Sequence, residues 1–346
     1  MTTFWIFYLL CLQTTLRFVT IHSQSDEHNP RLLFVFGDSY ADTGNIPFPN
    51  ATAWHVPYGM SWPGSPSGRF SDGFVETDFL ASALGIPSPT QYARVLDNVT
   101  ISGGVNFAVG GSGVTYAFGT PSFQTQVGWF KKLVKEGRFT EESLTRALFF
   151  VSVSGNDYGA YNGTTLEGFF PLARKVPRLI DLTLRRLYSL GARNFIIVSL
   201  PPFLCLPSNT VISDYRECDK NETLREVVKD HNHHLGNRLK NMTRNLEQSN
   251  VLYLQQTRAM LYILHHLSEF NLTEGLKPCC VGTCSSFDVN GNPLFTVCDT
   301  PGEHFFWDAV HPSQAGWRAV VKLYTRSTRF TGFVWTLAEW VDSLRS

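Results

Sequence analysis

The sequence predicts an α/β domain in which a parallel β-sheet is covered by helices on both faces. Several short runs of four to seven residues are apolar throughout, which is typical of strands buried on both faces. Longer stretches of helical character lie between these runs, and such alternation favours a parallel sheet. The chain has 346 residues, 43% of them hydrophobic and 14% aromatic, which suffices for a large core. No repeat, low-complexity segment or linker divides it, so a single domain is expected over residues 26–346.

The expected elements alternate along the chain. Four apolar runs are expected to form strands: RLLFVFG at 31–37, ALFFVSVSG at 147–155, NFIIVSLPP at 194–202 and VLYLQQ at 251–256. Five longer segments are expected to form helices: 73–84, 124–136, 178–190, 221–248 and 313–327.

The N-terminal residues have the pattern of a secretory signal. An apolar run from Phe4 to Leu12 is followed by small polar residues, although no Lys or Arg precedes it. Residues 1–25 are therefore expected to be a signal peptide cleaved near Ser23 or Ser25; an uncleaved anchor and a buried terminus are the alternatives. No later run approaches the roughly 18 apolar residues that a membrane helix needs, so no stable membrane insertion is expected.

Sequons and cysteines also indicate export to an extracellular, oxidising compartment. The chain holds six Asn-x-Ser/Thr sequons, which are acceptors for glycans on surface loops: Asn50, Asn98, Asn162, Asn221, Asn241 and Asn271. Loss of Cys11 with the signal leaves six cysteines, which predict up to three disulfides: Cys205, Cys218, Cys279, Cys280, Cys284 and Cys298. Cys205 is expected to pair with Cys218 across a short loop, and the other four among themselves. A zinc site at those four is the disfavoured alternative, because adjacent cysteines fit a tetrahedral site poorly.

The charge balance gives no electrostatic reason to expect an acidic partner. Lys and Arg total 29, as do Asp and Glu, so the formal net charge is zero. Nothing electrostatic favours nucleic acid or an acidic membrane surface, and catalysis on a neutral substrate stays open.

Two histidine groups are interpreted without a catalytic role. The cluster DHNHHLG, with His231, His233 and His234, is expected on a solvated helix face, and His265 and His266 on a helix surface or in satisfied packing.

Three polar motifs fall where strands are expected to end. The first run ends in Gly37-Asp38-Ser39, a later one in Ser154-Gly155-Asn156-Asp157, and FFWDAVHPS near the C-terminus contains Asp308 and His311. The Gly-rich segment GGVNFAVGGSGV, 103–114, also follows a short apolar stretch. In parallel α/β sheets, functional groups gather beyond the carboxyl ends of the strands. These motifs are therefore expected to meet.

Together the motifs supply the roles of a serine hydrolase. Ser39 can attack, His311 can take its proton and return it to the leaving group, and Asp308 can fix the imidazole and stabilise its charge. Pro312 disfavours an α conformation at His311, so this pair is expected in a loop before the last long helix. Backbone N–H groups at Ser39 and the glycine turn, with the Asn156 amide, can donate to an oxyanion.

Each motif alone has a plainer interpretation. Gly-Asp-Ser and Gly-Asn-Asp are common turns, and Asp308 with His311 can form a structural hydrogen-bonded pair. The Gly-rich segment resembles a nucleotide loop, but it has neither a Lys-Ser/Thr ending nor a Gly-x-Gly-x-x-Gly match. The occurrence of all four in order, at expected strand ends, favours the catalytic interpretation.

The chain resembles the GDSL esterase/lipases of the SGNH hydrolase superfamily, in their secreted plant form. The resemblance runs through FVFGDSYADTGN, GRFSDGFVETDFLA, GVNFAVGGSG, VSVSGNDY, IIVSLPP and FWDAVHPS, and so covers essentially the whole mature chain. One departure is visible, since Tyr40 stands where the family name has leucine. No Gly-x-Ser-x-Gly elbow occurs, which argues against an ordinary α/β-hydrolase lipase.

The resemblance implies specific roles and a specific fold. Ser39, Asp308 and His311 match the catalytic residues, Asn156 matches an oxyanion donor, and Gly111 is favoured as the oxyanion glycine over Gly104 and Gly110. The implied fold is a flavodoxin-like three-layer α/β/α sandwich with strand order 2-1-3-4-5.

The expected activity is that of a secreted serine esterase. Such an enzyme is expected to hydrolyse carboxylic esters through an acyl-serine intermediate, with no metal or organic cofactor. Its substrate is a small-molecule, lipid, cutin-type, polysaccharide acetyl or phenolic ester, and the sequence indicates no oligomeric state. An acyltransferase and a catalytically idle, glycan-binding wall protein are the alternatives.

The segment 46–72 between the first motif and the first expected helix is rich in Pro, Gly and aromatic residues. Prolines restrict its backbone, so a fixed wall of an open cleft is expected rather than a mobile lid. Trp54, Tyr58 and Trp62 are expected either to pack onto the core or to stack on a sugar or phenolic group. An open cleft predicts a preference for short acyl groups.

Overall fold

The centre of the fold is a six-stranded parallel β-sheet. The computed structural model describes residues 31–49, 51–115, 118–153, 155–163, 165–332 and 334–344, so the expected signal peptide and the sequon at Asn50 lie outside the described residues. The strands are β1 (Leu33–Gly37), β2 (Thr90–Gln91), β3 (Gly104–Asn106), β4 (Leu148–Ser152), β5 (Asn194–Val198) and β6 (Asn250–Leu254), in the order β2-β3-β1-β4-β5-β6. Every neighbouring pair is parallel. The predicted α/β fold class is confirmed, and without the two-residue edge strand β2 the order is the expected one.

The strand β1 shows why apolar runs form this sheet. Its side chains alternate between the two faces, with Leu33 and Val35 in one apolar cluster and Phe34 and Phe36 in the other. All four are fully buried. A strand that is covered on both faces has no position for a polar side chain until it ends, which is why the motif residues begin at its carboxyl edge.

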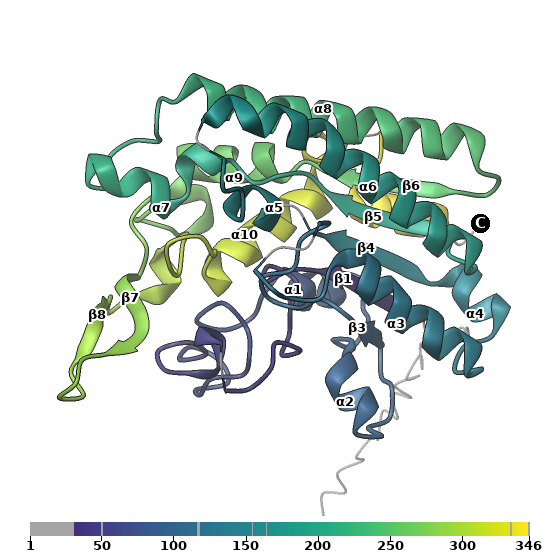
Figure 1. Cartoon of the computed structure of the whole chain (residues 1–346), viewed down its shortest axis with the longest axis horizontal. Helices are drawn as coiled ribbons and strands as arrows, with labels where there is room; N and C mark the ends of the chain where they lie inside the picture. The colour runs from purple at the N-terminus through teal and green to yellow at the C-terminus, as the bar shows by residue number, and fades with distance from the viewer. Residues whose placement is uncertain are drawn as a thin grey trace, which may run out of the picture. The chain divides into compact units, whose positions relative to one another are not determined.

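Helices cover both faces of the sheet and complete a three-layer sandwich. The cluster containing Phe34 includes residues of α3 (Phe123–Lys135), α6 (Phe169–Ser189) and α8 (Glu222–Asn245), and α6 lies beside α8 (Figure 1). The cluster containing Leu33 includes residues of α1 (Glu76–Ala83), α9 (Gln256–His265), α10 (Gln314–Arg326) and α11 (Leu337–Ser343).

Shorter elements lie in the connections. The short α-helices are α2 (Tyr92–Leu96), α4 (Glu141–Arg146), α5 (Asn156–Gly159) and α7 (Pro207–Thr210), and β7 (Cys280–Phe287) pairs with β8 (Pro293–Val297) in an antiparallel hairpin. Single turns of 3-10 helix occur at Thr52–Trp54, Leu166–Gly168, Phe203–Cys205, Val211–Ser213, Leu267–Phe270, Pro301–Glu303 and Thr328–Phe330.

The observed helices differ from the expected ones at one place above all. The helix expected to begin at residue 178 begins at Phe169, and Pro177 lies buried inside it. Proline removes one backbone donor from a helix and disfavours its interior, but α6 packs along α8 and against the sheet, and this tertiary packing outweighs the local cost. The sequence also did not predict α9, whose first residue, Gln256, was included in the preceding strand.

Three disulfides are present. They join Cys205 to Cys218, Cys279 to Cys298, and Cys280 to Cys284. The first is the expected pair; its partners are 13 residues apart in sequence, and closing a loop of about 15 residues stabilises a fold by roughly 3 kcal/mol. Cys279, Cys280 and Cys284 form a small buried cluster with Tyr58 and Trp307, so two of the disulfides lie under the loop that carries Asp308.

In the part of the chain that the structure describes, no helix has the length and apolar character needed to cross a bilayer. Within the same residues, no group of three or more His, Cys, Asp or Glu side chains is arranged to hold a metal ion.

Candidate active site

Ser39 lies directly beyond the carboxyl end of β1, in a sharp turn. The turn passes so close to β4 that a Cβ atom at Gly37 would lie 2.2 Å from the Ser152 carbonyl oxygen, which explains the glycine. The Asp42 N–H donates to the Asp38 carbonyl at 2.9 Å and closes the turn. Gln126 of α3 holds the backbone of Gly37, because its Oε1 accepts from Gly37 N at 2.9 Å and its Nε2 donates to Gly37 O at 2.8 Å.

His311 and Asp308 lie in the loop before α10, as the proline at 312 predicts. The Trp307 N–H donates to the His311 carbonyl at 2.8 Å and makes the loop tight. Ser313 ends it: its hydroxyl donates to His304 O at 2.6 Å and accepts from Gly316 N at 3.0 Å as the N-cap of α10. A capped helix start thus fixes the backbone next to the imidazole.

The three side chains form one hydrogen-bonded chain. The Ser39 Oγ is 2.8 Å from His311 Nε2, and His311 Nδ1 is 2.8 Å from both carboxylate oxygens of Asp308. All three residues are buried, because Ser39 is 8%, His311 9% and Asp308 6% exposed. Burial alone would raise the pKa of Asp308, but the His311 charge and the hydrogen bonds that the carboxylate accepts outweigh it and hold the pKa below its ordinary value. Asp308 is therefore ionised at neutral pH and can orient and stabilise an imidazolium.

A fourth side chain, which the sequence did not indicate for this role, binds Asp308. The Tyr58 hydroxyl donates to Asp308 Oδ2 at 2.7 Å, and the tyrosine is only 4% exposed. Burial and the neighbouring Asp308 charge raise the pKa of Tyr58 well above its ordinary value, so it stays a donor.

The stacking role considered for Tyr58 is thereby wrong, and core packing is correct. Trp54 instead donates from Nε1 to Ile46 O at 2.7 Å, and Trp62 stacks on Phe74.

Two aromatic rings hold the imidazole in place. Phe70 stacks on His311 with ring centroids 5.1 Å apart, and Tyr40 meets the same ring edge-on at 5.8 Å. The Tyr40 hydroxyl also donates to the Val310 carbonyl at 2.7 Å. The residue that departs from the family name thus joins the serine turn to the histidine loop.

The groups expected to bind an oxyanion lie around Ser39. Among the described residues, neither the Ser39 N–H nor the Gly111 N–H donates to a protein acceptor, whereas the Gly110 N–H is engaged by Asp42 Oδ2 at 2.8 Å. Gly111 has φ +81°, a left-handed conformation that favours glycine. The Asn156 amide donates one hydrogen to Ser112 O at 2.8 Å, and its second N–H remains for a ligand.

A cavity of about 610 Å³ opens in front of Ser39. Ser39, Tyr40, Gly111, Asn156 and His311 contribute to its wall. The remaining wall is mainly apolar and includes Phe118, Phe169, Phe203, Leu206 and Leu224. The volume lies in the range of small-molecule sites, and such sites combine an apolar wall with a few polar groups.

One histidine interpretation is wrong. His231 is fully buried rather than solvated, and its Nδ1 is 2.8 Å from the hydroxyl of Tyr158, which lines the cavity. Burial, followed by the nearby His234, lowers the pKa of His231 to about 3, so the ring is neutral. The adjacent His233 is exposed, and so are His265 and His266, as expected.

The remaining sequence-predicted positions are outside the cavity. Asn98, Asn162, Asn241 and Asn271 are exposed. Asn221 is half-buried because its side chain accepts from Leu224 N at 2.9 Å and caps α8. Exposure is compatible with glycan attachment, which stays a prediction.

Comparison with known proteins places the chain in a family. A family model described as GDSL-like Lipase/Acylhydrolase matches residues 33–323. A GDSL esterase/lipase of Arabidopsis thaliana is 37% identical over 351 residues, which cover 94% of this chain and 96% of the relative. A second Arabidopsis GDSL esterase/lipase is 37% identical over 86% of this chain and 88% of its own. Acetylajmalan esterase 2 of Rauvolfia serpentina is 30% identical over 84% of this chain and 88% of its own.

A parallel α/β sheet that brings a serine, a histidine and an aspartate together at its carboxyl edge has the architecture of a serine hydrolase. The chain belongs to the GDSL esterase/lipase family of the SGNH hydrolase superfamily, and it is a carboxylic ester hydrolase.

Proposed function

We propose that the chain is a secreted serine esterase that hydrolyses short-chain carboxylic esters through an acyl-enzyme at Ser39. The observation that carries the proposal is the continuous hydrogen-bonded chain from the Ser39 hydroxyl through the His311 imidazole to the Asp308 carboxylate. Protein groups fill every role, so the proposed reaction requires no metal or organic cofactor.

The proposed reaction has two halves. Ser39 Oγ attacks the ester carbonyl while His311 Nε2 takes its proton, and the carbonyl oxygen becomes an oxyanion held by the N–H groups of Ser39 and Gly111 and the Asn156 amide. When the tetrahedral intermediate collapses, the carbon–oxygen bond to the alcohol breaks and His311 returns the proton to it. Water then attacks the acyl-serine with His311 again as base, which releases the carboxylic acid and restores the Ser39 hydroxyl.

One observation supports a short acyl group, because the relative from Rauvolfia carries in its name an acetylated substrate. The cavity beside Ser39, with its apolar wall, accommodates such an acyl group.

The same acyl-enzyme also supports acyl transfer to an alcohol, and an idle glycan-binding wall protein is the second alternative. The purified protein and its Ser39→Ala variant should be presented with acetyl, butyryl, palmitoyl and feruloyl esters, with and without an acceptor alcohol. We expect acid release that is abolished in Ser39→Ala. A new ester formed at the expense of acid would favour the transferase, and no turnover of any ester by the wild type would favour the binding protein.

Secretion is supported by the three disulfides and by four exposed sequons. Expression of the full chain in a eukaryotic cell should give a product in the medium that begins near Asp26 and carries glycans. Mass spectrometry that finds six unmodified thiols in protein from the medium would contradict the disulfides, and retention of the uncleaved chain in the cell would contradict secretion.

A further inference from the structure

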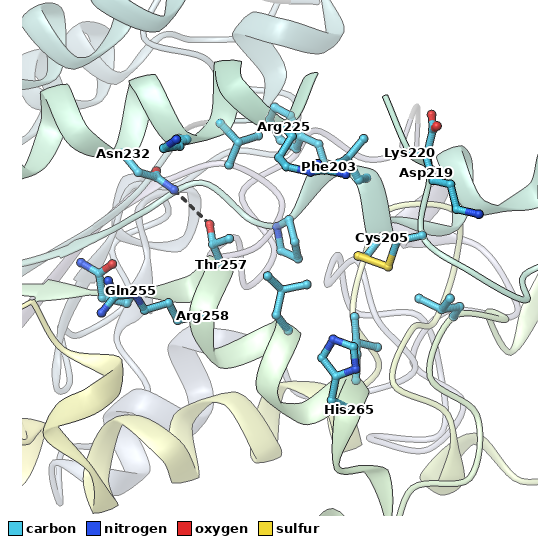
Figure 2. Close-up of a pocket in the computed structure, with 18 of the residues that line it drawn as sticks. Phe203, Cys205, Asp219, Lys220, Arg225, Asn232, Gln255, Thr257, Arg258 and His265 are labelled. Atoms are coloured by element: carbon cyan, nitrogen blue, oxygen red, sulfur yellow. Dashed lines mark hydrogen bonds between the residues drawn. A yellow bond between two sulfur atoms is a disulfide. The ribbon is translucent and has the colours of Figure 1, made fainter. Parts of the chain in front are cut away.

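A second, larger cavity lies at the carboxyl ends of β5 and β6. Its volume is about 840 Å³, compared with about 610 Å³ for the cavity at Ser39. It lies between the N-terminal half of α8 and the length of α9, with the segment after β5 along one wall (Figure 2). Ligands of parallel α/β sheets bind beyond the carboxyl ends of the strands. The position and size of the cavity are therefore those of a ligand site.

The inner wall of this cavity is apolar. Pro202, Phe203 and Leu204 follow β5, Val228 comes from α8, and Leu261, Leu264 and Leu276 complete the wall. Two of the polar side chains that line the cavity, Asn232 and Thr257, already have protein partners. Asn232 Oδ1 accepts from Leu200 N at 2.9 Å, and its Nδ2 donates to Thr257 Oγ1 at 3.0 Å (Figure 2). The wall therefore suits the aliphatic part of a ligand and offers little to a neutral polar molecule.

The rim of the cavity is basic, although the whole chain has a formal net charge of zero. Five cationic side chains contribute to it, against two carboxylates: Arg216, Lys220, Arg225, Lys229 and Arg258, against Glu217 and Asp219. Lys220 pairs with Glu217 at 2.8 Å, and Lys229 pairs with Glu226 at 3.2 Å. In the described part of the chain, Arg216 and Arg258 have no carboxylate within 4.0 Å. Arg216 Nε donates to Ser213 O at 3.0 Å, which leaves the terminal nitrogens of Arg216 and the Arg258 guanidinium for an anion. A guanidinium matches a carboxylate with two parallel hydrogen bonds.

We propose that this cavity binds an aliphatic carboxylate, with the chain against the apolar wall and the head group at the basic rim. Ester hydrolysis releases a carboxylic acid that is ionised at neutral pH. Turnover of an ester with a medium-length acyl chain, although slower than that of an acetyl ester in the proposed function, therefore releases a ligand of this chemistry. Phe203 lines both cavities, and the Cys205–Cys218 disulfide lies beside it in the wall. A ligand in the second cavity therefore contacts the Phe203 ring, which also lines the Ser39 cavity. The identification of the ligand as a product rests on the proposed function, whereas binding itself does not.

Binding of sodium decanoate to the full, disulfide-bonded protein tests the proposal directly, by isothermal titration calorimetry at pH 7.5 and low salt. Decanamide serves as the neutral isostere. We expect the Arg216→Gln/Arg258→Gln double variant to bind decanoate at least tenfold more weakly than wild type. Arg138→Gln, which removes an exposed charge away from both cavities, should bind like wild type. Decanamide should bind at least tenfold more weakly than decanoate.

Because an acid product also fits the cavity at Ser39, the location needs its own variant. Leu261→Asn places a polar group on the apolar wall of the second cavity and should weaken decanoate binding, with thermal unfolding used to verify that the variant is folded. Equal affinity of the double arginine variant and wild type, or of decanamide and decanoate, would overturn the proposal. So would unchanged binding in folded Leu261→Asn. None of these outcomes bears on ester hydrolysis at Ser39, which the Ser39→Ala comparison tests separately.

Discussion

The hydroxyl of Tyr58 donates a 2.7 Å hydrogen bond to Oδ2 of Asp308, although 250 residues separate the two in sequence. The other oxygen, Oδ1, accepts from the backbone N–H groups of Val310 and His311 at 2.9 and 2.8 Å. Among the described residues, Tyr58 is therefore the group that holds Oδ2 in addition to the imidazole. The segment before the first long helix thus contributes directly to the arrangement of the candidate catalytic residues.

Tyr58→Phe should leave the fold intact and lower kcat about tenfold, which corresponds to about 1.4 kcal/mol. Without the Tyr58 hydroxyl, the negative charge of Asp308 is less compensated and stabilises the imidazolium more strongly. The acidic limb of the kcat/KM profile should therefore move to higher pH. We expect a displacement of about 0.5 pH unit, equivalent to roughly 0.7 kcal/mol.

The matched control for Tyr58→Phe is Tyr188→Phe, which removes a hydroxyl that donates to Glu247 O on the far part of α6. Its pH profile should equal that of wild type. If Tyr58→Phe lowered kcat without moving the acidic limb, Tyr58 would have only a packing role.

The Asn156 amide is expected to donate to charge that develops only in the transition state. Asn156→Ala should lower kcat by about 10²- to 10³-fold with little change in KM. Steady-state kinetics with a soluble acetyl ester measure both constants. A raised KM with unchanged kcat would identify Asn156 as a substrate-binding residue instead of an oxyanion donor.

Glu76 gives stability a defined dependence on pH. The residue is fully buried at the start of α1, and burial raises its pKa to about 8, against a hydrogen bond from the Ser152 hydroxyl at 3.2 Å. A carboxyl whose folded pKa is raised binds its proton more tightly in the folded state, so stability is present below the unfolded pKa of about 4.5 and is lost as pH rises towards 8.

Thermal unfolding at several pH values tests this dependence. Glu76→Gln cannot ionise, so its Tm relative to wild type should rise between pH 5 and pH 8 and then level off. The exposed substitution Glu247→Gln should show no such trend. Parallel Tm curves for wild type and Glu76→Gln would show that the buried carboxyl is accommodated in its charged form.

Acyl-chain preference tests the interpretation of the cavity at Ser39. We expect higher kcat/KM on acetyl and butyryl esters than on palmitoyl esters, and no jump in rate when the substrate exceeds its solubility. The reason is that Tyr58 and Phe70 tie the segment 46–72 to Asp308 and His311, so we expect this segment to stay in place rather than to open as a lid. A steep rise in rate at emulsion formation, with palmitoyl esters preferred, would mean that the segment opens as a lid.

The sequence predicted the sheet and the meeting of the motifs because both depend on local patterns. β1 and β4 are uninterrupted apolar runs, and the polar residues that follow each strand necessarily share one edge of a parallel sheet. Pro312 likewise placed His311 in a loop rather than in α10. The nearness of Ser39, Asp308 and His311 follows from these short-range features.

What the sequence did not predict depends on long-range packing. Tyr58 and Phe70 come from an irregular segment, and no periodicity indicates which of its aromatic side chains turns toward Asp308. His231 was misread because a polar helix segment gives no sign that a buried Tyr158 hydroxyl faces it. The helix α6 continues through Pro177 because its contacts with α8 and the sheet outweigh the missing hydrogen bond.

The central claim is that Ser39 is the nucleophile, activated by His311. The direct test is to treat the purified protein with a fluorophosphonate ester and locate the adduct by peptide mass spectrometry. The account predicts one adduct, on the peptide that contains Ser39, with activity lost in proportion to labelling. Labelling should be absent in Ser39→Ala and slowed by roughly 10³-fold or more in His311→Ala. An adduct on another residue, or full ester turnover by purified Ser39→Ala, would contradict the account.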